Sequence, residues 1–178
     1  MKRTFALIFF LLALSSVQNF SFSQQKISED MKALAASFFE LTQKHNFTEV
    51  SRLFNYPSEY TKEQLSQDMS MVRKMTQLIN DQFGEIKRVN PVSSQDSSLQ
   101  IGVGGGDLPY WEKHPTFIRV CYDVQFANAG SGSIDFYFAN IRNKWEIRQV
   151  NYGLPVSRAD ASDLIMKTMQ KLSQLTPD

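Results

Sequence analysis

Three consecutive glycines, Gly104 to Gly106, lie in the segment IGVGGGDLPYWEKHP, residues 101–115. A phosphate-binding loop needs glycines that lead into a helix start, usually with a lysine beside them. Here no lysine or helix follows directly, Pro109 and Pro115 break helical geometry, and a strand pattern begins at Thr116. We therefore interpret the glycines as backbone freedom at the end of a strand, and we exclude nucleotide binding.

The same segment carries three side chains that could form the lip of a ligand site, namely Tyr110, Trp111 and His114. In the alternative that we favour, Trp111 folds back onto the end of a sheet and His114 is solvated. We keep all three residues as candidate ligand-binding residues.

Metal and nucleophile chemistry have little support in the sequence. Neither His45 nor His114 lies in a metal-binding pattern such as HExxH. Cys121 is the single cysteine, which excludes an intrachain disulfide and a cysteine-based zinc site. Because it lies inside a strand pattern, we expect a buried, inert thiol. Spacing alone does not exclude a Ser–His–Asp triad, but no nucleophile-elbow pattern supports one. We expect no metal and no cofactor.

The clearest strand is TFIRVCYDVQFAN, residues 116–128, in which apolar and polar residues alternate. With two later strands it predicts an inner sheet face of ten aliphatic and aromatic residues: Ile118, Val120, Tyr122, Val124, Phe126, Ile134, Phe136, Phe138, Trp145 and Ile147. This face has no carboxylate and no histidine, which argues against acid–base catalysis. Its candidates for ligand contact are Tyr122, as the polar anchor, with Phe136 and Trp145 as walls.

The opposite face of these strands carries charged residues, and a slip of one residue would bury them all. We therefore expect Asp123 and Asp135 to be exposed partners of Arg119 and Arg148. Exposed pairs of this kind contribute roughly 0.2–1 kcal/mol each.

Helical periodicity and capping residues predict four helices. The first begins at Ser28 and ends near His45, and a short second helix runs from Asn46 to Pro57. A capping box, Thr61 with Gln64, begins a long third helix that ends at Gly84. Ser157 with Asp160 predicts a last helix that runs to about Leu175.

Between the third and last helices the period changes to two, which predicts strands near residues 85–92, 99–103, 116–128, 134–138 and 145–148. Short turns between these strands favour an antiparallel meander with one buried face. The fold class is therefore α+β, with N-terminal helices packed on a curved antiparallel sheet and an extra C-terminal helix.

Three stretches resemble the nuclear-transport-factor-like, or cystatin-like, superfamily of α+β cones. They are the helix pair ALAASFFELTQKHNFTEVSRLFN, the helix and first strand LINDQFGEIKRV, and the hairpin FYFANIRNKWEIRQV. The resemblance implies helices that fill a curved sheet. It also implies a choice among enzymes, small-molecule binders and interaction modules, since such folds host all three. The C-terminal helix is additional to the usual pattern and could cover the mouth of the cone.

The first 23 residues have the pattern of a secretory signal peptide, with Lys2 and Arg3 before an apolar run from Phe5 to Leu14. That run is too short to span a bilayer, so we expect export to a bacterial periplasm or the extracellular space without stable membrane insertion. Residues 24–178 then form one α+β domain. Loss of Lys2 and Arg3 changes the formal net charge from +1 to −1, which excludes general attraction to nucleic acid.

The sequence thus predicts an exported, non-enzymatic domain that binds a small apolar ligand or a protein partner. The alternative is an isomerase- or hydrolase-like enzyme of the same fold that uses an acid or base in its pocket. A homodimer is left open.

Overall fold

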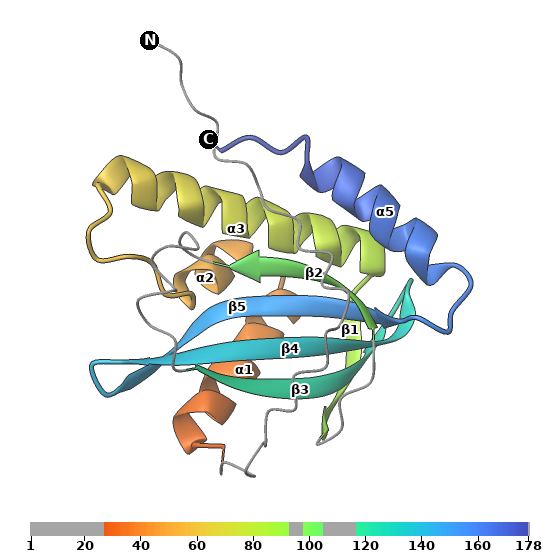
Figure 1. Ribbon diagram of the computed structural model, residues 1–178, viewed down its shortest axis with the longest axis horizontal. Helices are drawn as coiled ribbons and strands as arrows, with labels where there is room; N and C mark the ends of the chain where they lie inside the picture. The colour runs from red at the N-terminus through yellow and green to blue at the C-terminus, as the bar shows by residue number, and fades with distance from the viewer. Residues whose placement is uncertain (1–26, 93–97, 105–116, 178) are drawn as a thin grey trace.

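The computed structural model describes residues 27–92, 98–104 and 117–177, which form four helices and one five-stranded antiparallel sheet (Figure 1). The helices are α1 (Glu29–Gln43), α2 (Phe47–Arg52), α3 (Lys62–Phe83) and α5 (Ala161–Leu172). The strands are β1 (Ile86–Val92), β2 (Ser98–Gly104), β3 (Phe117–Phe126), β4 (Gly130–Ile141) and β5 (Lys144–Pro155). The predicted α+β class is confirmed.

The first three helices begin at the predicted caps. The Ser28 hydroxyl accepts a hydrogen bond from the Met31 N–H at 3.3 Å. At α3 the reciprocal capping box of Thr61 and Gln64 is complete, with bonds of 3.2 and 2.9 Å. His45 ends α1 in the left-handed region, with φ 53°, which places it in the turn between two helices.

The last helix begins later than predicted. Asp160 occupies the N-cap position of α5 and makes no capping bond through its side chain. Its carboxylate instead accepts two hydrogen bonds, at 2.9 and 2.6 Å, from the Arg158 guanidinium. Ser157 therefore lies outside the helix, and the prediction that it caps α5 is wrong. α5 packs beside α3 and β2 (Figure 1).

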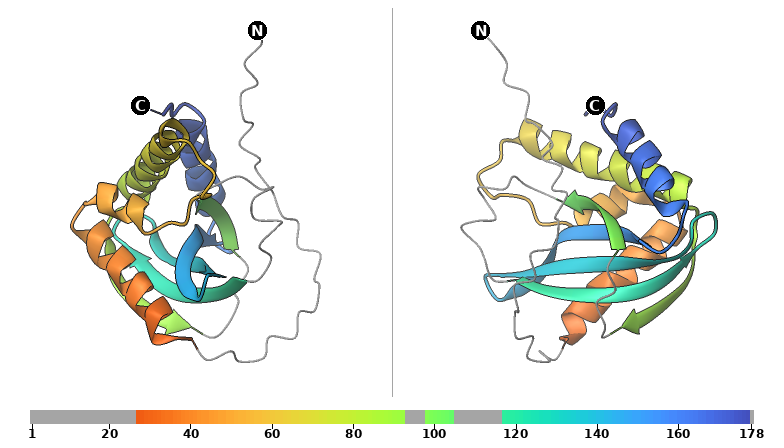
Figure 2. Two further views of the ribbon diagram at one scale, coloured as in Figure 1. Left: turned by 90° about the vertical axis from the view of Figure 1, so that its left-hand side faces the viewer. Right: turned by 45° about the vertical axis from the view of Figure 1, so that its right-hand side comes forward.

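The order of strands across the sheet is β1-β3-β4-β5-β2, which differs from a simple meander (Figure 2). β3, β4 and β5 are joined by short turns as predicted, and Arg142 and Asn143, both with positive φ, form the two-residue turn between β4 and β5. β2 does not lie beside β1 or β3. It pairs with β5 at the opposite edge of the sheet, because alternation in a sequence specifies a strand's face but not its neighbour.

A β-bulge interrupts the pairing of β4 with β5. Tyr137 lies opposite Gln149 and Phe138 lies opposite Ile147, so Arg148 is the extra residue. The bulge shifts the alternation by one residue, which places both Ile147 and Val150 in the core. β5 continues to Pro155 and is therefore longer than the strand predicted near residues 145–148.

α1 and α3 cover the inner face of the sheet, which is apolar as predicted. Seven of the ten residues assigned to this face are at most 4% exposed, and Tyr122 is 9% exposed. Ile118 and Trp145 are partly buried and pack against the same core. In the part of the chain that the structure describes, no helix is both long enough and apolar enough to cross a membrane.

Candidate functional site

Aromatic rings fill the space between α1 and the inner face of the sheet. The centroid of the Phe38 ring lies 5.1 Å from that of Phe136, and the Phe39 centroid lies 5.3 Å from that of Tyr122. Tyr122 and Phe136 also contact each other edge to face, with centroids 5.6 Å apart. These contacts are typical of a packed core.

The predicted ligand residues therefore lie in different environments. Tyr122 and Phe136 are core residues of β3 and β4. Trp145 is half-buried near the start of β5, opposite Asn140, and packs against the edge of the core. Tyr110, Trp111 and His114 lie outside the described residues.

The outer face of the sheet contains a charged side chain, Asp135, whose burial differs from the sequence-based expectation. Asp135 is paired with Arg119 as predicted, with 2.6 Å between Oδ2 and Nη2, but its side chain is 0% exposed and that of Arg119 is 21% exposed. The expectation of an exposed pair at Asp135 is thus wrong. Asp123 is exposed as predicted, yet it has no ion pair with another described residue.

Side-chain amides complete a polar network around Asp135. Gln100 of β2 donates from Nε2 to Asp135 Oδ2 at 2.6 Å and accepts from Asn151 Nδ2 at 2.9 Å. Gln149 donates to Asn151 at 2.5 Å. Gly102 leaves room for these amides, because a Cβ atom there would lie 2.8 Å from Gln149 Nε2. The network joins β2, β5, β4 and β3 across the outer face and holds the buried carboxylate by hydrogen bonds.

Cys121 lies directly across from Asp135 on the same face. Burial and the neighbouring carboxylate raise the pKa of its thiol to about 12. An activated cysteine has a lowered pKa, so this thiol is suited to a structural role. The raised pKa agrees with the expected inert thiol, but Cys121 is partly exposed, so the expectation that it is buried is wrong.

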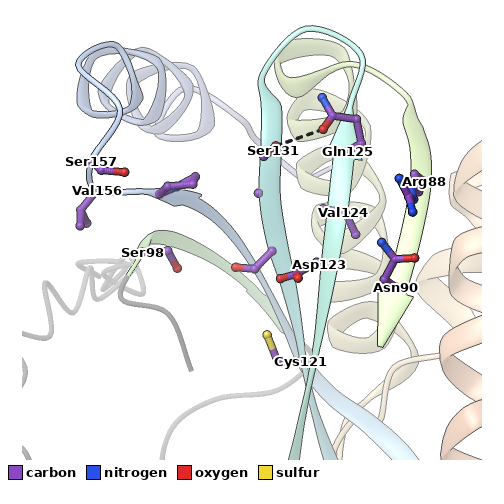
Figure 3. A pocket seen from close by; sticks show the side chains of 13 residues that line it. Arg88, Asn90, Ser98, Cys121, Asp123, Val124, Gln125, Ser131, Val156 and Ser157 are labelled. Atoms are coloured by element: carbon purple, nitrogen blue, oxygen red, sulfur yellow. Dashed lines mark hydrogen bonds between the residues drawn. The ribbon is translucent and has the colours of Figure 1, made fainter. Parts of the chain in front are cut away.

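A hollow of about 600 Å³ lies on the outer face, between β1, the β3–β4 hairpin and the end of β5 (Figure 3). Most of its lining residues have polar side chains, while polar and apolar atoms contribute nearly equal exposed surface: Arg88, Asn90, Ser98, Cys121, Asp123, Val124, Gln125, Ser131, Gly132, Ser133, Pro155, Val156 and Ser157. At the hairpin tip Ser131 donates to Gln125 at 3.1 Å. The volume falls within the range typical of ligand sites.

Two opposite charges line this hollow without a partner among the described residues. Arg88 of β1 lies across from Gln125, and Asp123 of β3 lies across from Asn90, so neither charge faces its complement. Both side chains are exposed. Figure 3 shows them on the same side of the sheet, on neighbouring strands.

Two hydroxyl groups converge on the other side of the hollow, above Gly153. A Cβ atom at Gly153 would lie 2.5 Å from Ser133 Oγ and 2.6 Å from Ser98 Oγ. Only glycine lets both hydroxyls approach the backbone here. The hollow thus offers one cation, one anion and several neutral hydrogen-bonding groups.

The sequence does not reveal this hollow, because its residues come from five separate segments that share no motif. The feature that points to this hollow is the pair of unmatched charges, Arg88 and Asp123. It can be recognised once the pairing register of β1 and β3 is known. Within the described residues, no three His, Cys, Asp or Glu side chains are grouped so that they could hold a metal ion.

Comparisons with known proteins bear on the fold. No protein-family model matches the chain, and no curated protein matches its sequence. Among solved structures, the chain is similar to a Campylobacter jejuni protein named as an NTF2-like (nuclear-transport-factor-like) transpeptidase, with 13% identity over 65% of this chain and 94% of that one and a TM-score of 0.42. It is also similar to a Mycobacterium tuberculosis protein of unknown function, with 11% identity over 84% of this chain and 90% of that one and a TM-score of 0.42. The observed layers agree with the α+β cone resemblance, and these distant matches say nothing about function.

Proposed function

We propose that this protein is a non-enzymatic binding domain and that its site is the outer-face hollow. The observation that supports this is the contrast between the two faces of the sheet. The inner face is closed by ring contacts around Phe136, whereas the outer face has a 600 Å³ hollow whose charged groups are unpaired.

The polar lining makes a small polar ligand the best occupant. An apolar ligand, which the sequence favoured, needs apolar walls around it. In this hollow most side chains carry hydroxyl, amide or charged groups, and the apolar surface, such as that of Val156, lies between these groups without forming a closed apolar wall. A polar ligand that satisfies these groups replaces the hydrogen bonds that they make to water.

The enzyme alternative has weaker support. It needs a carboxylate or histidine that faces an internal cavity, with a pKa suited to proton transfer. Among the described residues, the one buried charged side chain is Asp135, which lies on the outer face and is held by Arg119 and Gln100.

The proposal can be tested by NMR with three small probes on the mature protein: glycylglycine, D-glucose and inorganic phosphate. At least one probe should shift the amide signals of Asp123 and Ser133 saturably, and Ser133→Trp, which fills the hollow, should abolish the shift. A probe concentration of about 10 mM is tenfold above a weak Kd of about 1 mM, so it would nearly saturate even a weak site. If no probe shifts these signals at that concentration, the proposed site is wrong.

A protein partner is the second candidate, because Val156 at the rim of the hollow is 52% exposed. A photo-crosslinking residue at position 156 should then trap one discrete adduct in the compartment where the protein works. Lack of any adduct there would remove this candidate.

We also propose that the chain is exported, on the strength of the signal-peptide pattern in residues 1–23. N-terminal sequencing of the protein from the periplasmic or secreted fraction should begin near Gln24. Recovery of a chain that begins at Met1 from that fraction would contradict the proposal.

A further inference from the structure

We infer that the hollow binds a short peptide with free termini, whose carboxylate meets Arg88 and whose ammonium group meets Asp123. This inference rests on the proposed function and names the ligand class for the same site. It depends on the arrangement of the two charges and on the spacing of the two strand positions that carry them.

Arg88 and Asp123 are available to a ligand because the sheet pairs each with a neutral amide. Opposite charges on neighbouring strands commonly face each other and form a cross-strand pair. Here the register places Gln125 across from Arg88 and Asn90 across from Asp123. The other ion pairs of the described residues, such as Lys87–Glu85 at the start of β1, leave these two groups free. A ligand that carries both charges would complement each group.

The spacing of the two charges fits a dipeptide. Arg88 and Asp123 are diagonal neighbours on antiparallel strands, which places their Cβ atoms about 7–8 Å apart. An extended chain spans about 3.3–3.6 Å per residue, so the ammonium and carboxylate of a dipeptide lie about 7 Å apart. A guanidinium group also binds a carboxylate through two parallel hydrogen bonds, which favours a carboxylate at Arg88.

The neutral groups of the hollow suit the peptide bond between these termini. The hydroxyls of Ser98 and Ser133, above Gly153, can donate to a carbonyl oxygen or accept from an amide N–H. Asn90 and Gln125 supply both donors and acceptors. The lining therefore offers a partner to each polar group of a glycine-containing dipeptide.

The test compares glycylglycine with two blocked forms, N-acetyl-glycylglycine and glycylglycinamide, by isothermal titration calorimetry and NMR. Each blocked form should bind about tenfold more weakly than glycylglycine, since it lacks one charge-assisted hydrogen-bonding group. Arg88→Gln should weaken glycylglycine to a similar extent but leave the amide form unaffected. Asp123→Asn should weaken glycylglycine and leave the acetylated form unaffected. Matched controls, Arg142→Gln and Asp163→Asn, should bind like the wild type.

Two results would overturn the inference. In the first, glycylglycine leaves the Asp123 and Ser133 signals unchanged while glucose or phosphate shifts them, which would keep the proposed site and reject the peptide. In the second, glycylglycine binds but either blocked form binds equally well, or Arg88→Gln weakens the amide form as much as the free peptide. Failure of all three probes would instead reject the proposed function itself.

Discussion

The two faces of the sheet differ in the interactions that their side chains make. The inner face is closed by aromatic contacts, with Phe136 in contact with Phe38, Phe39 and Tyr122. The outer face buries one carboxylate, Asp135, within a network of hydrogen bonds and leaves a polar hollow beside it. The comparison shows that the packed core and the hollow lie on opposite faces of the sheet. The inner face provides the core, so the outer face can hold unpaired charges.

The largest effect should come from the inner face. Phe136→Ala removes a fully buried ring that contacts four others, and it should lower the free energy of unfolding by about 3–5 kcal/mol. Urea unfolding followed by circular dichroism measures this loss. A loss below about 1 kcal/mol would mean that the space between α1 and the sheet is not tightly packed.

The second effect concerns the two aspartates of the outer face. Asp135→Asn removes the charge that binds Arg119 and Gln100, and it should cost about 1.5–3 kcal/mol, as for other hydrogen bonds to charged groups. Asp123→Asn is the matched control, because Asp123 is exposed and unpaired, and its effect should stay within about 0.5 kcal/mol. Equal losses in the same urea assay would show that burial does not distinguish these residues.

Asp123 and Asp135 also show which features of the fold can be predicted from the sequence and which cannot. The period of two places both residues on the outer face and predicts that they pair with Arg119 and Arg148, without saying which aspartate pairs with which arginine. It does not predict the burial of Asp135, because that depends on Gln100, whose strand lies two places away in the sheet. Local signals, such as the capping box at Thr61, specify helix starts because they act within one turn. Strand order, the bulge at Arg148 and the hollow depend on contacts between distant segments, which no local pattern records.

A third effect should appear at alkaline pH. Burial raises the pKa of Tyr152 on the inner face and, on the outer face, that of Tyr137. Because the unfolded chain ionises near pH 10 and the folded chain above it, this contribution to stability is complete below about pH 10 and is lost as pH rises. The slope should approach about 1.4 kcal/mol per pH unit for each such group.

Variants can assign this slope to one face. Tyr152→Phe should flatten the dependence of unfolding free energy on pH between about 10 and 11.5, since Tyr152 is more deeply buried than Tyr137. Tyr137→Phe should flatten it less. A larger effect of the Tyr137 variant would mean that the outer face excludes water better than the core does.

The smallest effect is expected for Tyr122→Phe. The ring of Tyr122 packs against Phe39 and Phe136, but its hydroxyl has no hydrogen-bond partner among the described residues. The substitution keeps the ring, so the free energy of unfolding should change by less than about 0.5 kcal/mol. Binding of glycylglycine should not change, because Tyr122 lies on the opposite face from the hollow. Weaker binding in this variant would move the site to the inner face.

The position of β2 at the far edge of the sheet has a consequence for folding order. The strands β3, β4 and β5 are connected by short turns and can pair early, whereas Gln100 of β2 and its partner Asn151 are 51 residues apart. Closing a long loop costs more entropy than closing a short turn, and such distant contacts form slowly. We therefore expect β2 to join last. Until it does, the Asp135 carboxylate has Arg119 but lacks Gln100, so the final step of folding also supplies the second hydrogen-bond donor to Oδ2 of this buried charge.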